Sequence, residues 1–548
     1  MTESPFMRAP LEPREQPILD KLLQARAALE LLKQDKSTYV KSSDVLRLYN
    51  AVVDQVVVLN EIRSTGNKRL EQNRVDTVLD DCFQLISLAF LTIGKNHEAP
   101  AVYAALSTIK RLLDHLKEAA FFSSKDLDSI SSRLQDFRKY IDRGREGYSP
   151  HLITLLENRI DMCQATLTEL QDALAPLGPE LSPHYEKLVS ILRSLSACNT
   201  KSKFPTQEVN DLHAQLKEVE ASLGPIVENQ QPLSEKELLD LYYKKYQDMQ
   251  IEPGSHQTGK IIVNNLMIRC FLWVDIIKKK RGRIDERFQD TFDKLNHIKM
   301  QLERLSLTHA WSLRETDLYS YQRQLDRIDE SRVDGNFLDD QGQPADLHAQ
   351  RTLLYLLRKS YALIYHLIIS SEPVSEALVP IYNQLLTLRR CLLEVRKSGG
   401  VSSPRELYPY SMKLNSIDNM RNDGKFMVGE DIPDGQAAVT QLLEECFDMA
   451  YELRSAAEEE EEREEREDAA VAEAERKADE ESGERVRVEP GAEPGKNGLK
   501  AAAAGGSESE DEDEGLDEGV EIKAKERSGS GGGQEKGAVM RDGDVGGF

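Results

Sequence analysis

The chain has 548 residues, of which 39% are hydrophobic and only 6% aromatic, and its formal net charge is −24. Residues 455–548 carry 30 acidic and 13 basic side chains, so most of the negative charge lies at the C-terminal end. Because phosphate binding requires a cationic face, this distribution argues against duplex nucleic acid as a direct partner. The length allows several domains or one long repeat array.

The N-terminal stretch 1–16 is interrupted by prolines and lacks an apolar core segment, so we expect a flexible start without a signal peptide. No run of about twenty apolar residues is present, and we therefore expect no membrane insertion. The cysteines lie far apart without a CxxC pair, which favours reduced thiols that pack as small apolar groups. These cysteines are Cys82, Cys163, Cys198, Cys270, Cys391 and Cys446. A soluble intracellular protein is the resulting expectation.

Helical periodicity extends almost without interruption from Pro17 to Arg454, and convincing strand alternation is missing. Segments such as KLLQARAALELL and YNQLLTLRRCLLEV place apolar residues at i, i+3, i+4 and i+7. The sequence therefore predicts an all-α fold, with an N-terminal helical region at 17–250 and a C-terminal one at 251–454 that shows the clearest repeats. Serines precede several predicted helices, and Ser403 is followed by Pro404 and Glu406 in the pattern of a capping box.

Two side-chain patterns recur along these helices. In the first, a tyrosine is followed by leucine three residues later, at Tyr103 and Leu106, Tyr185 and Leu188, and Tyr382 and Leu385. In the second, an apolar residue precedes a small and an aromatic residue, as in Leu79-Cys82-Phe83, Met267-Cys270-Phe271, Leu357-Ser360-Tyr361 and Leu443-Cys446-Phe447. Each spacing places its side chains on one helical face. We expect tandem, diverged three-helix units, in the order Cys/Phe helix, Tyr/Leu helix, Ser-capped helix, forming an extended array or bundles.

The clearest repeat is the frame LYxYxxxLxxIDxxRxDGxF, present at 318–337 and again at 407–426. An EF-hand is excluded, because Arg332 and Arg421 would occupy a ligand position of the calcium loop. The glycines that follow favour a turn with φ > 0. Two roles remain open for Arg332 and Arg421: an ion pair with the aspartate of their own motif or with a neighbouring unit, or a phosphate or carboxylate site.

The C-terminal segment 455–548 is predicted to begin as a charged helix, with Glu459–Arg463 and Glu462–Arg466 as i,i+4 pairs, and to become disordered from 483. Within it, Ser507 and Ser509 directly precede carboxylates and are candidate phosphorylation sites for an acidophilic kinase. The basic run Lys278, Lys279, Lys280 and Arg281 ends an apolar helix. Such a run either faces the helix dipole or serves nuclear import.

No catalytic or cofactor motif is recognisable. TIGKNHE at 92–98 lacks the spacing of a phosphate loop, the histidines show no metal-ligand spacing, and no serine lies in GxSxG. We therefore predict no enzyme activity, no cofactor and no metal site. An enzyme assembled from distant residues would escape such a search.

The LYxYxxxLxxID frame, the DGxF loops and the glutamate-rich C-terminal segment resemble an uncharacterised fungal family of helical proteins, over residues 15–455 approximately. A budding-yeast member of that family is named for copper suppression and bleomycin sensitivity. The resemblance implies a protein of the cytoplasm and nucleus, with a pointer towards DNA-damage tolerance or proteasome-linked work. It supplies no reaction, ligand or catalytic residue.

Three functional hypotheses follow. The first is a non-enzymatic scaffold or adaptor whose helical units bind protein partners. The second is a stress-response factor linked to DNA-damage (bleomycin) tolerance or proteasome function. The third is an unrecognised enzyme or small-ligand-binding protein. The identity of the partners and the oligomeric state are left open by the sequence.

Overall fold

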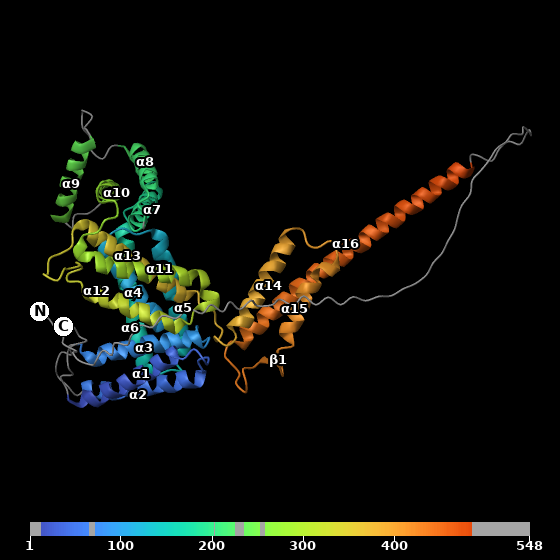
Figure 1. The fold of residues 1–548 in the computed structure, drawn as a ribbon, viewed down its shortest axis with the longest axis horizontal. Helices are drawn as coiled ribbons and strands as arrows, with labels where there is room; N and C mark the ends of the chain where they lie inside the picture. The colour runs from blue at the N-terminus through green and yellow to red at the C-terminus, as the bar shows by residue number, and fades with distance from the viewer. Residues whose placement is uncertain (1–12, 65–71, 202, 225–234, 252–257, 485–548) are drawn as a thin grey trace, which may run out of the picture. The chain divides into compact units, whose positions relative to one another are not determined.

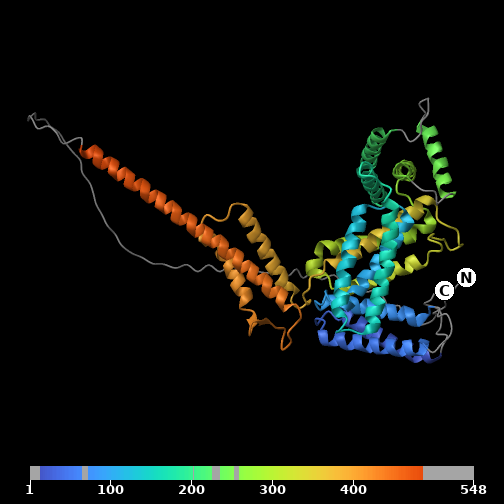
Figure 2. The same ribbon diagram turned by 180° about the vertical axis from the view of Figure 1, so that it is seen from behind.

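The computed structural model describes residues 13–64, 72–201, 203–224, 235–251 and 258–484, and these ranges are helical almost throughout (Figure 1; Figure 2 shows the reverse side). The predicted all-α fold class is confirmed. Within the described ranges, the strands β1 (Arg421–Asn422) and β2 (Lys425–Phe426) form an antiparallel pair of two residues each.

The described helices group along the chain into successive three-helix bundles, which we number 1 to 5. Bundle 3 contains an additional helix, α9, between its second and third helices. Bundle 1 comprises α1 (Gln16–Gln34), α2 (Ser42–Ser64) and α3 (Arg74–Thr92), and bundle 2 comprises α4 (Val102–Ala119), α5 (Ser124–Gly144) and α6 (Pro150–Leu174). Bundle 3 comprises α7 (Ser182–Asn199), α8 (Thr206–Leu223), α9 (Glu235–Ile251) and α10 (Gly259–Lys280). Bundle 4 comprises α11 (Gln289–Ser312), α12 (Leu318–Glu330) and α13 (Leu347–Ile369), and bundle 5 comprises α14 (Val379–Lys397), α15 (Tyr408–Asp418) and α16 (Gln436–Glu484).

Short 3-10 helices lead into some of these elements. They are η1 (Pro13–Glu15), η2 (Ala99–Ala101), η3 (Glu286–Phe288), η4 (Glu315–Asp317) and η5 (Pro404–Leu407). Ser403 caps η5, since its side chain accepts a hydrogen bond from the backbone N–H of Arg405. Ser123 caps α5 and completes a capping box with Asp126. Serine thus marks helix starts at both positions, as the sequence predicts.

The third helix of a bundle packs closely against the first, and a buried cysteine lies at this seam in four bundles. Each thiol donates to the backbone carbonyl of a leucine on the first helix. The pairs are Cys82 and Leu22, Cys163 and Leu106, Cys270 and Leu188, and Cys446 and Leu385, at 3.5, 3.9, 3.7 and 3.6 Å. In bundle 4, the small residue Ser360 occupies the corresponding place and is fully buried. A small side chain at this position allows the two helices to approach.

The three-helix units predicted from the sequence are present, but the order of their helices differs from the expectation. The Cys helix closes a bundle instead of opening it, because its thiol reaches the Tyr/Leu helix that begins the same bundle earlier in the chain. Leu106, Leu188 and Leu385 of the Tyr/Leu pattern are the acceptors. In bundles 3 and 5 the two recurring patterns are therefore the two sides of one contact.

The buried apolar residues form three clusters. One cluster is shared by bundles 1, 2 and 4, a second belongs to bundle 3, and a third belongs to bundle 5. After bundle 3 the chain therefore returns, and α13 packs against α4 while α12 contacts α3 (Figure 1). Long-range packing of this kind brings charged residues of α4 and α12 face to face.

Both copies of the DG motif form tight hairpin turns. Asp334 and Gly335 have φ of 49° and 78°, and Asp423 and Gly424 have 48° and 75°. Two successive residues with φ > 0 are the conformation of a type I′ turn, for which Asp-Gly is a favoured sequence. The predicted positive φ of the glycines is confirmed, and the aspartates share it.

A glutamine at the start of the following helix holds each turn in place. The side chain of Gln350 accepts from the N–H of Phe337 and donates to its carbonyl, at 3.0 Å in both cases. Gln436 makes the same pair with Phe426, at 2.9 and 2.7 Å. Phe337 and Phe426 are both buried. The repeated motif therefore connects the second helix of a bundle to its third.

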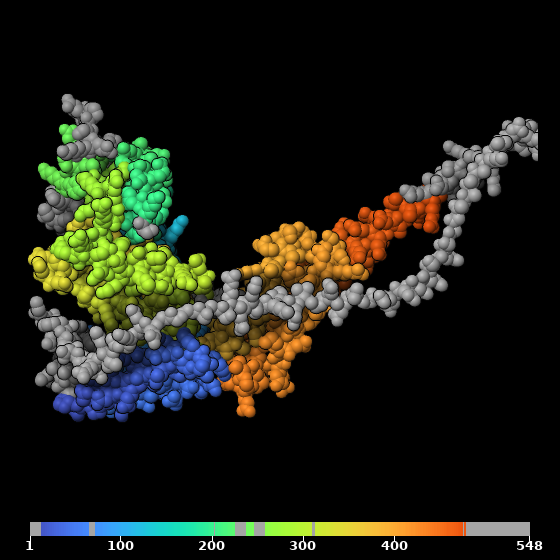
Figure 3. Space-filling model, viewed as in Figure 1, coloured from blue at the N-terminus to red at the C-terminus, as the bar shows by residue number. Residues whose placement is uncertain are grey.

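The last helix, α16, extends well beyond the core of bundle 5. Every described side chain from Glu458 onwards is exposed, and Figure 3 draws this helix in orange to red. Arg466 pairs with Glu462 at 2.9 Å, as predicted. Arg463 pairs with Glu460 and Glu467, and the predicted Glu459 pair is not formed because these carboxylates reach the guanidinium instead. Disorder is predicted from 483, but residues 483–484 still belong to α16, and 485–548 lie outside the described residues.

Replacing Gln436 with alanine removes both hydrogen bonds to the backbone of Phe426, and we expect a destabilisation of about 1–3 kcal/mol. Hydrogen–deuterium exchange of the Phe426 amide is expected to accelerate. Gln441→Ala is the matched control, since its amide bonds to the exposed Glu445 on the same helix. Unchanged exchange at Phe426 in Gln436→Ala would contradict the assigned role.

Candidate functional site

A cleft of about 1090 Å³ lies between α3, α4, α6, α12 and α13. Charged side chains of both signs line it, and the acidic and basic groups nearly balance. They are Asp76, Asp80, Lys110, Arg111, Asp114, Arg159, Arg323, Asp326, Glu330, Arg332 and Asp334. Bundles 1, 2 and 4 all contribute, so the cleft exists only because bundle 4 packs against the first two.

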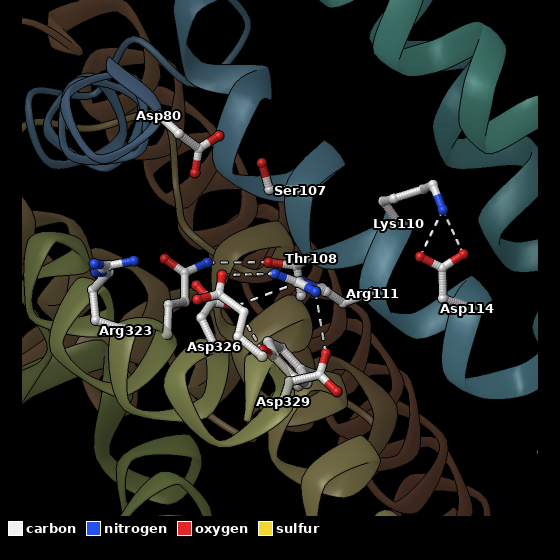
Figure 4. Close-up of polar contacts among 12 residues, drawn as sticks. Asp80, Ser107, Thr108, Lys110, Arg111, Asp114, Arg323, Asp326 and Asp329 are labelled. Atoms are coloured by element: carbon white, nitrogen blue, oxygen red, sulfur yellow. Dashed lines mark hydrogen bonds and ion pairs between the residues drawn. The ribbon is translucent and has the colours of Figure 1, made fainter. Parts of the chain in front are cut away.

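Arg111 on α4 is the centre of one charged network. Its guanidinium lies 3.3 Å from Asp329, 3.4 Å from Glu330 and 3.6 Å from Asp326, all on α12 (Figure 4). The hydroxyl of Tyr361 donates to Asp326 at 2.6 Å. One guanidinium thus compensates three carboxylates across the joint between bundles 2 and 4.

Asp326 and Asp329 differ in acidity although they lie one helical turn apart. Burial raises the pKa of Asp326 to about 6, and the charge of Arg111 only partly offsets this effect. Burial would also raise the pKa of Asp329, but the hydrogen bond and charge of His115, with Arg332 and Arg111, hold it at about 2. His115 lies 3.1 Å from Asp329. Asp326 is therefore a carboxyl group that titrates near neutral pH in a charged cleft.

A second network occupies the opposite side of the cleft. Arg159 of α6 donates to Ser107 at 2.7 Å and to Asp80 at 2.6 Å. Its guanidinium also lies over the ring of Tyr103, 4.2 Å from the ring centre, and the Tyr103 hydroxyl donates to Asp80 at 2.5 Å. Tyr103, the tyrosine of the Tyr/Leu pattern, is thus buried in the core and also contacts both partners of the Asp80–Arg159 ion pair.

The structure places Arg332 at the edge of this cleft, in ion pairs. It donates to Asp329 at 2.9 Å and to both carboxylate oxygens of Glu118 on α4, at 2.6 and 3.0 Å. Arg421 pairs with Asp418 of its own motif. The predicted intra-motif pairs thus occur in both copies, and Arg332 also bridges two bundles.

The other predicted sites lie away from the cleft. Lys278 contacts His213, Lys279 pairs with Asp275, and Lys280 pairs with Asp346. Arg281 ends α10 in the left-handed conformation, and Lys279, Lys280 and Arg281 are exposed. Ser507 and Ser509 lie outside the described residues.

The sequence did not single out Arg111, Arg159 or Asp326. One signal was available, because Asp326 is replaced by Asn415 in the second copy of an otherwise similar motif. Arg111 offers no such signal, since its partners are more than 200 residues away in the chain. The described residues contain no group of side chains that could hold a metal ion. In the same part of the chain, no helix is long and apolar enough to cross a membrane.

The fold and the cleft together define an all-helical protein of tandem three-helix bundles. The chain belongs to a fungal family of unknown function, and the resemblance noted from the sequence is confirmed. The family described as "Protein of unknown function (DUF2408)" matches residues 174–315 and 371–473, which include all of bundle 3, helix α11 and most of bundle 5.

Two relatives support this assignment over most of the chain. A CUB1 family protein of Schizosaccharomyces pombe is 38% identical over 463 residues, covering 83% of this chain and 95% of the relative. The "Cu(2+) suppressing and bleomycin sensitive protein 1" of Saccharomyces cerevisiae is 38% identical over 507 residues, covering 81% of this chain and 90% of the relative. No solved structure matches the chain.

The titration of Asp326 gives a test of the cleft. Its pKa is about 6 in the folded protein against 3.8 for an ordinary aspartate, so folding favours the protonated form. The stability that Asp326 contributes to the fold is therefore fully present below the pKa of the unfolded chain, 3.8. It is lost as the pH rises through the pKa of the folded protein, about 6.

Asp326→Asn removes this dependence. We expect the unfolding free energy of the variant, relative to the wild type, to increase by about 1 kcal/mol between about pH 5 and pH 7. Urea unfolding across that range measures it. Asp161→Asn, at an exposed carboxylate on α6, is the control. A difference between Asp326→Asn and wild type that does not vary with pH would contradict the assignment.

Proposed function

We propose that the protein is a non-enzymatic scaffold that binds a partner protein through the exposed face of α15 in bundle 5. The observation that carries the proposal is that the two copies of the repeated motif lie in different surroundings. In bundle 4 the outward face of the motif is covered by α3 and α4, whereas in bundle 5 no described element covers the corresponding face.

Matched positions of the motif show the difference directly. Tyr319 on α12 is 6% exposed, while the corresponding Tyr408 on α15 is 66% exposed. The next position on that face changes from Arg323, with its side chain 17% exposed, to Met412, which is 55% exposed. Further large apolar residues of bundle 5 are also exposed, namely Met420, Met427, Val428, Ile432 and Tyr451. An exposed apolar face such as that formed by Tyr408 and Met412 on α15 is typical of an interaction surface.

Bundle 4 indicates what kind of partner fits. There α4 covers the motif as a helix, presenting Arg111 and His115 to Asp329 and Thr108 to Gln322. By analogy, α15 suits an amphipathic helix that packs apolar side chains on Tyr408 and Met412 and offers a cation to Asp418. Met412 and Met420 add side chains that adapt to different partner shapes.

The absence of enzymatic activity is part of the proposal and is supported by the pairing within the cleft. Arg111 and Arg159 are each bonded to carboxylates of the protein itself, and Asp326 already accepts a hydrogen bond from Tyr361. These groups stabilise the joint between bundles. The near balance of charge in the cleft also favours a protein over duplex nucleic acid as the partner.

A second candidate function is a stress response linked to bleomycin or copper tolerance. It is favoured by the identity of 38% to the Saccharomyces cerevisiae protein named for copper suppression and bleomycin sensitivity. A scaffold in the cytoplasm and nucleus that assembles a repair or proteolytic complex would satisfy both candidates.

Replacing Met412 with aspartate places a charge in the proposed interface, and we expect at least a tenfold loss of partner binding. Met300→Asp on α11 is the matched control, because Met300 is 58% exposed. A photo-crosslinking residue at position 412 or 300 of the full chain, in a fungal extract, identifies what contacts each surface.

The expected result is one recurrent product at position 412, absent at 300, whose crosslinked peptide maps to an amphipathic helix of another protein. Identical products at both positions would contradict the proposed surface. Crosslinks only to a second copy of this chain would show self-association in its place.

The exposed basic residues at the end of α10 give a test of nuclear import. Changing Lys279, Lys280 and Arg281 to glutamine is expected to lower the nuclear fraction of a fluorescently tagged chain, since receptors recognise the positive charge. Lys244→Gln and Lys245→Gln, on the neighbouring α9, provide a control for lost charge. An unchanged distribution would remove the import role.

A further inference from the structure

A second cavity, of about 520 Å³, lies between the end of α4 and helices α7, α10 and α13. The turn residues Gly335 and Asn336 also line it, so the repeated motif of bundle 4 borders this cavity. Its walls combine cationic and aromatic side chains: Arg269, Arg351, Arg358, Phe121, Trp273 and Tyr355. This volume lies within the range of sites that bind small molecules.

Arg358 is the unusual residue of this cavity. Its Nη1 atom is buried and has no hydrogen-bond partner, and no carboxylate lies within ion-pair distance among the described residues. Its guanidinium lies over the ring of Phe121, 4.7 Å from the ring centre. Burial, with the charges of Arg193 and Arg269, lowers the pKa of Arg358 to about 10, and the charge of Asp126 offsets this effect only in part. A buried guanidinium without a counter-ion is costly, because it loses hydration without compensation.

The other charged groups of the cavity leave this cost uncompensated. Glu118 is the one carboxylate among the lining residues, and both of its oxygens are bound by Arg332. Arg269 donates to the carbonyls of Ala119 and Ala120 at the end of α4, at 2.6 and 2.8 Å. Arginines therefore outnumber carboxylates among the residues that line the cavity.

The aromatic walls indicate the rest of the ligand. The guanidinium groups of Arg358 and Arg269 lie 4.7 and 5.6 Å from the ring centre of Phe121. Trp273 forms another part of the wall, with Arg351 lying 5.6 Å from its ring centre. Flat apolar surfaces next to an unpaired guanidinium suit a molecule with an oxyanion at one end and a planar group at the other.

We propose that this cavity binds a small organic phosphate, whose oxyanion pairs with Arg358 and whose planar group packs against Phe121 and Trp273. No residue of α15 lines this cavity, so the site is distinct from the exposed face proposed to bind a partner. Arg358 contributes the charge and the donors, while the aromatic residues contribute the preference for an organic over an inorganic phosphate.

Isothermal titration calorimetry on the full chain in phosphate-free buffer tests the proposal, with phenyl phosphate, phenol and inorganic phosphate as probes. Phenyl phosphate is expected to bind saturably, phenol not to bind, and inorganic phosphate to bind at least tenfold more weakly than phenyl phosphate. No saturable binding of phenyl phosphate overturns the proposal. Equal affinity for inorganic phosphate overturns the role of the aromatic walls.

Arg358→Met and Lys359→Met form a matched pair, since both remove one positive charge from adjacent positions of α13 and Lys359 is exposed. Affinity for phenyl phosphate is expected to fall at least tenfold in Arg358→Met and to stay unchanged in Lys359→Met. Without ligand, Arg358→Met is expected to melt at the same or a higher temperature than wild type. The assignment of Arg358 is overturned if Arg358→Met binds phenyl phosphate as tightly as the wild type does. A lower melting temperature of this variant together with wild-type affinity for phenyl phosphate would show a purely structural role for Arg358.

Discussion

The structure depends on the contact between the first and third helices of each bundle. A cysteine or serine at this seam lets two helix backbones approach, and four of the thiols bond to a leucine carbonyl of the first helix. Burial raises the pKa of Cys82 and Cys270 to about 12, which keeps these thiols protonated and unreactive. The cysteines therefore act as small packing groups with a weak hydrogen bond.

Repetition of this seam explains how one motif acquired two environments. The second helix of a bundle packs its apolar stripe on the seam, and Leu325 and Leu414 are both fully buried. Its outward face is then available for another contact. In bundle 4 this face meets α4 and creates the charged cleft, whereas the same face of bundle 5 is exposed. The duplicated motif is thus a structural joint whose outer surface diverged, with Asp326 in one copy and Asn415 in the other.

Local chemistry made much of this fold predictable from the sequence. The i, i+3, i+4 spacing predicts the helices, and Asp-Gly predicts the turns. The expectation of packed thiols is correct for five cysteines and wrong for Cys391, which is exposed. The order of helices within a bundle was not predictable, because a Cys helix has neighbours on both sides in the chain and the pattern does not say which one it meets. Cys163 escaped the Cys/Phe pattern altogether, since Gln164 follows it.

The candidate sites depend on contacts that local patterns do not contain. Arg111 meets Asp329 across 218 positions of sequence, and this requires the return of bundle 4 onto bundles 1 and 2. Arg358 looks in the sequence like an ordinary surface cation at the end of an apolar run. Its proposed role is visible only in the structure, where its Nη1 atom has no hydrogen-bond partner and the lining carboxylate, Glu118, is bound by Arg332.

The most direct test of the account is the rate at which each cysteine of the native chain reacts with a thiol reagent, followed by mass spectrometry. Cys391 on α14 is exposed and is expected to react at once, while Cys82, Cys163, Cys270 and Cys446 react only as fast as their bundles unfold. If the seam cysteines reacted as quickly as Cys391 under native conditions, the packing of third on first helices would be wrong.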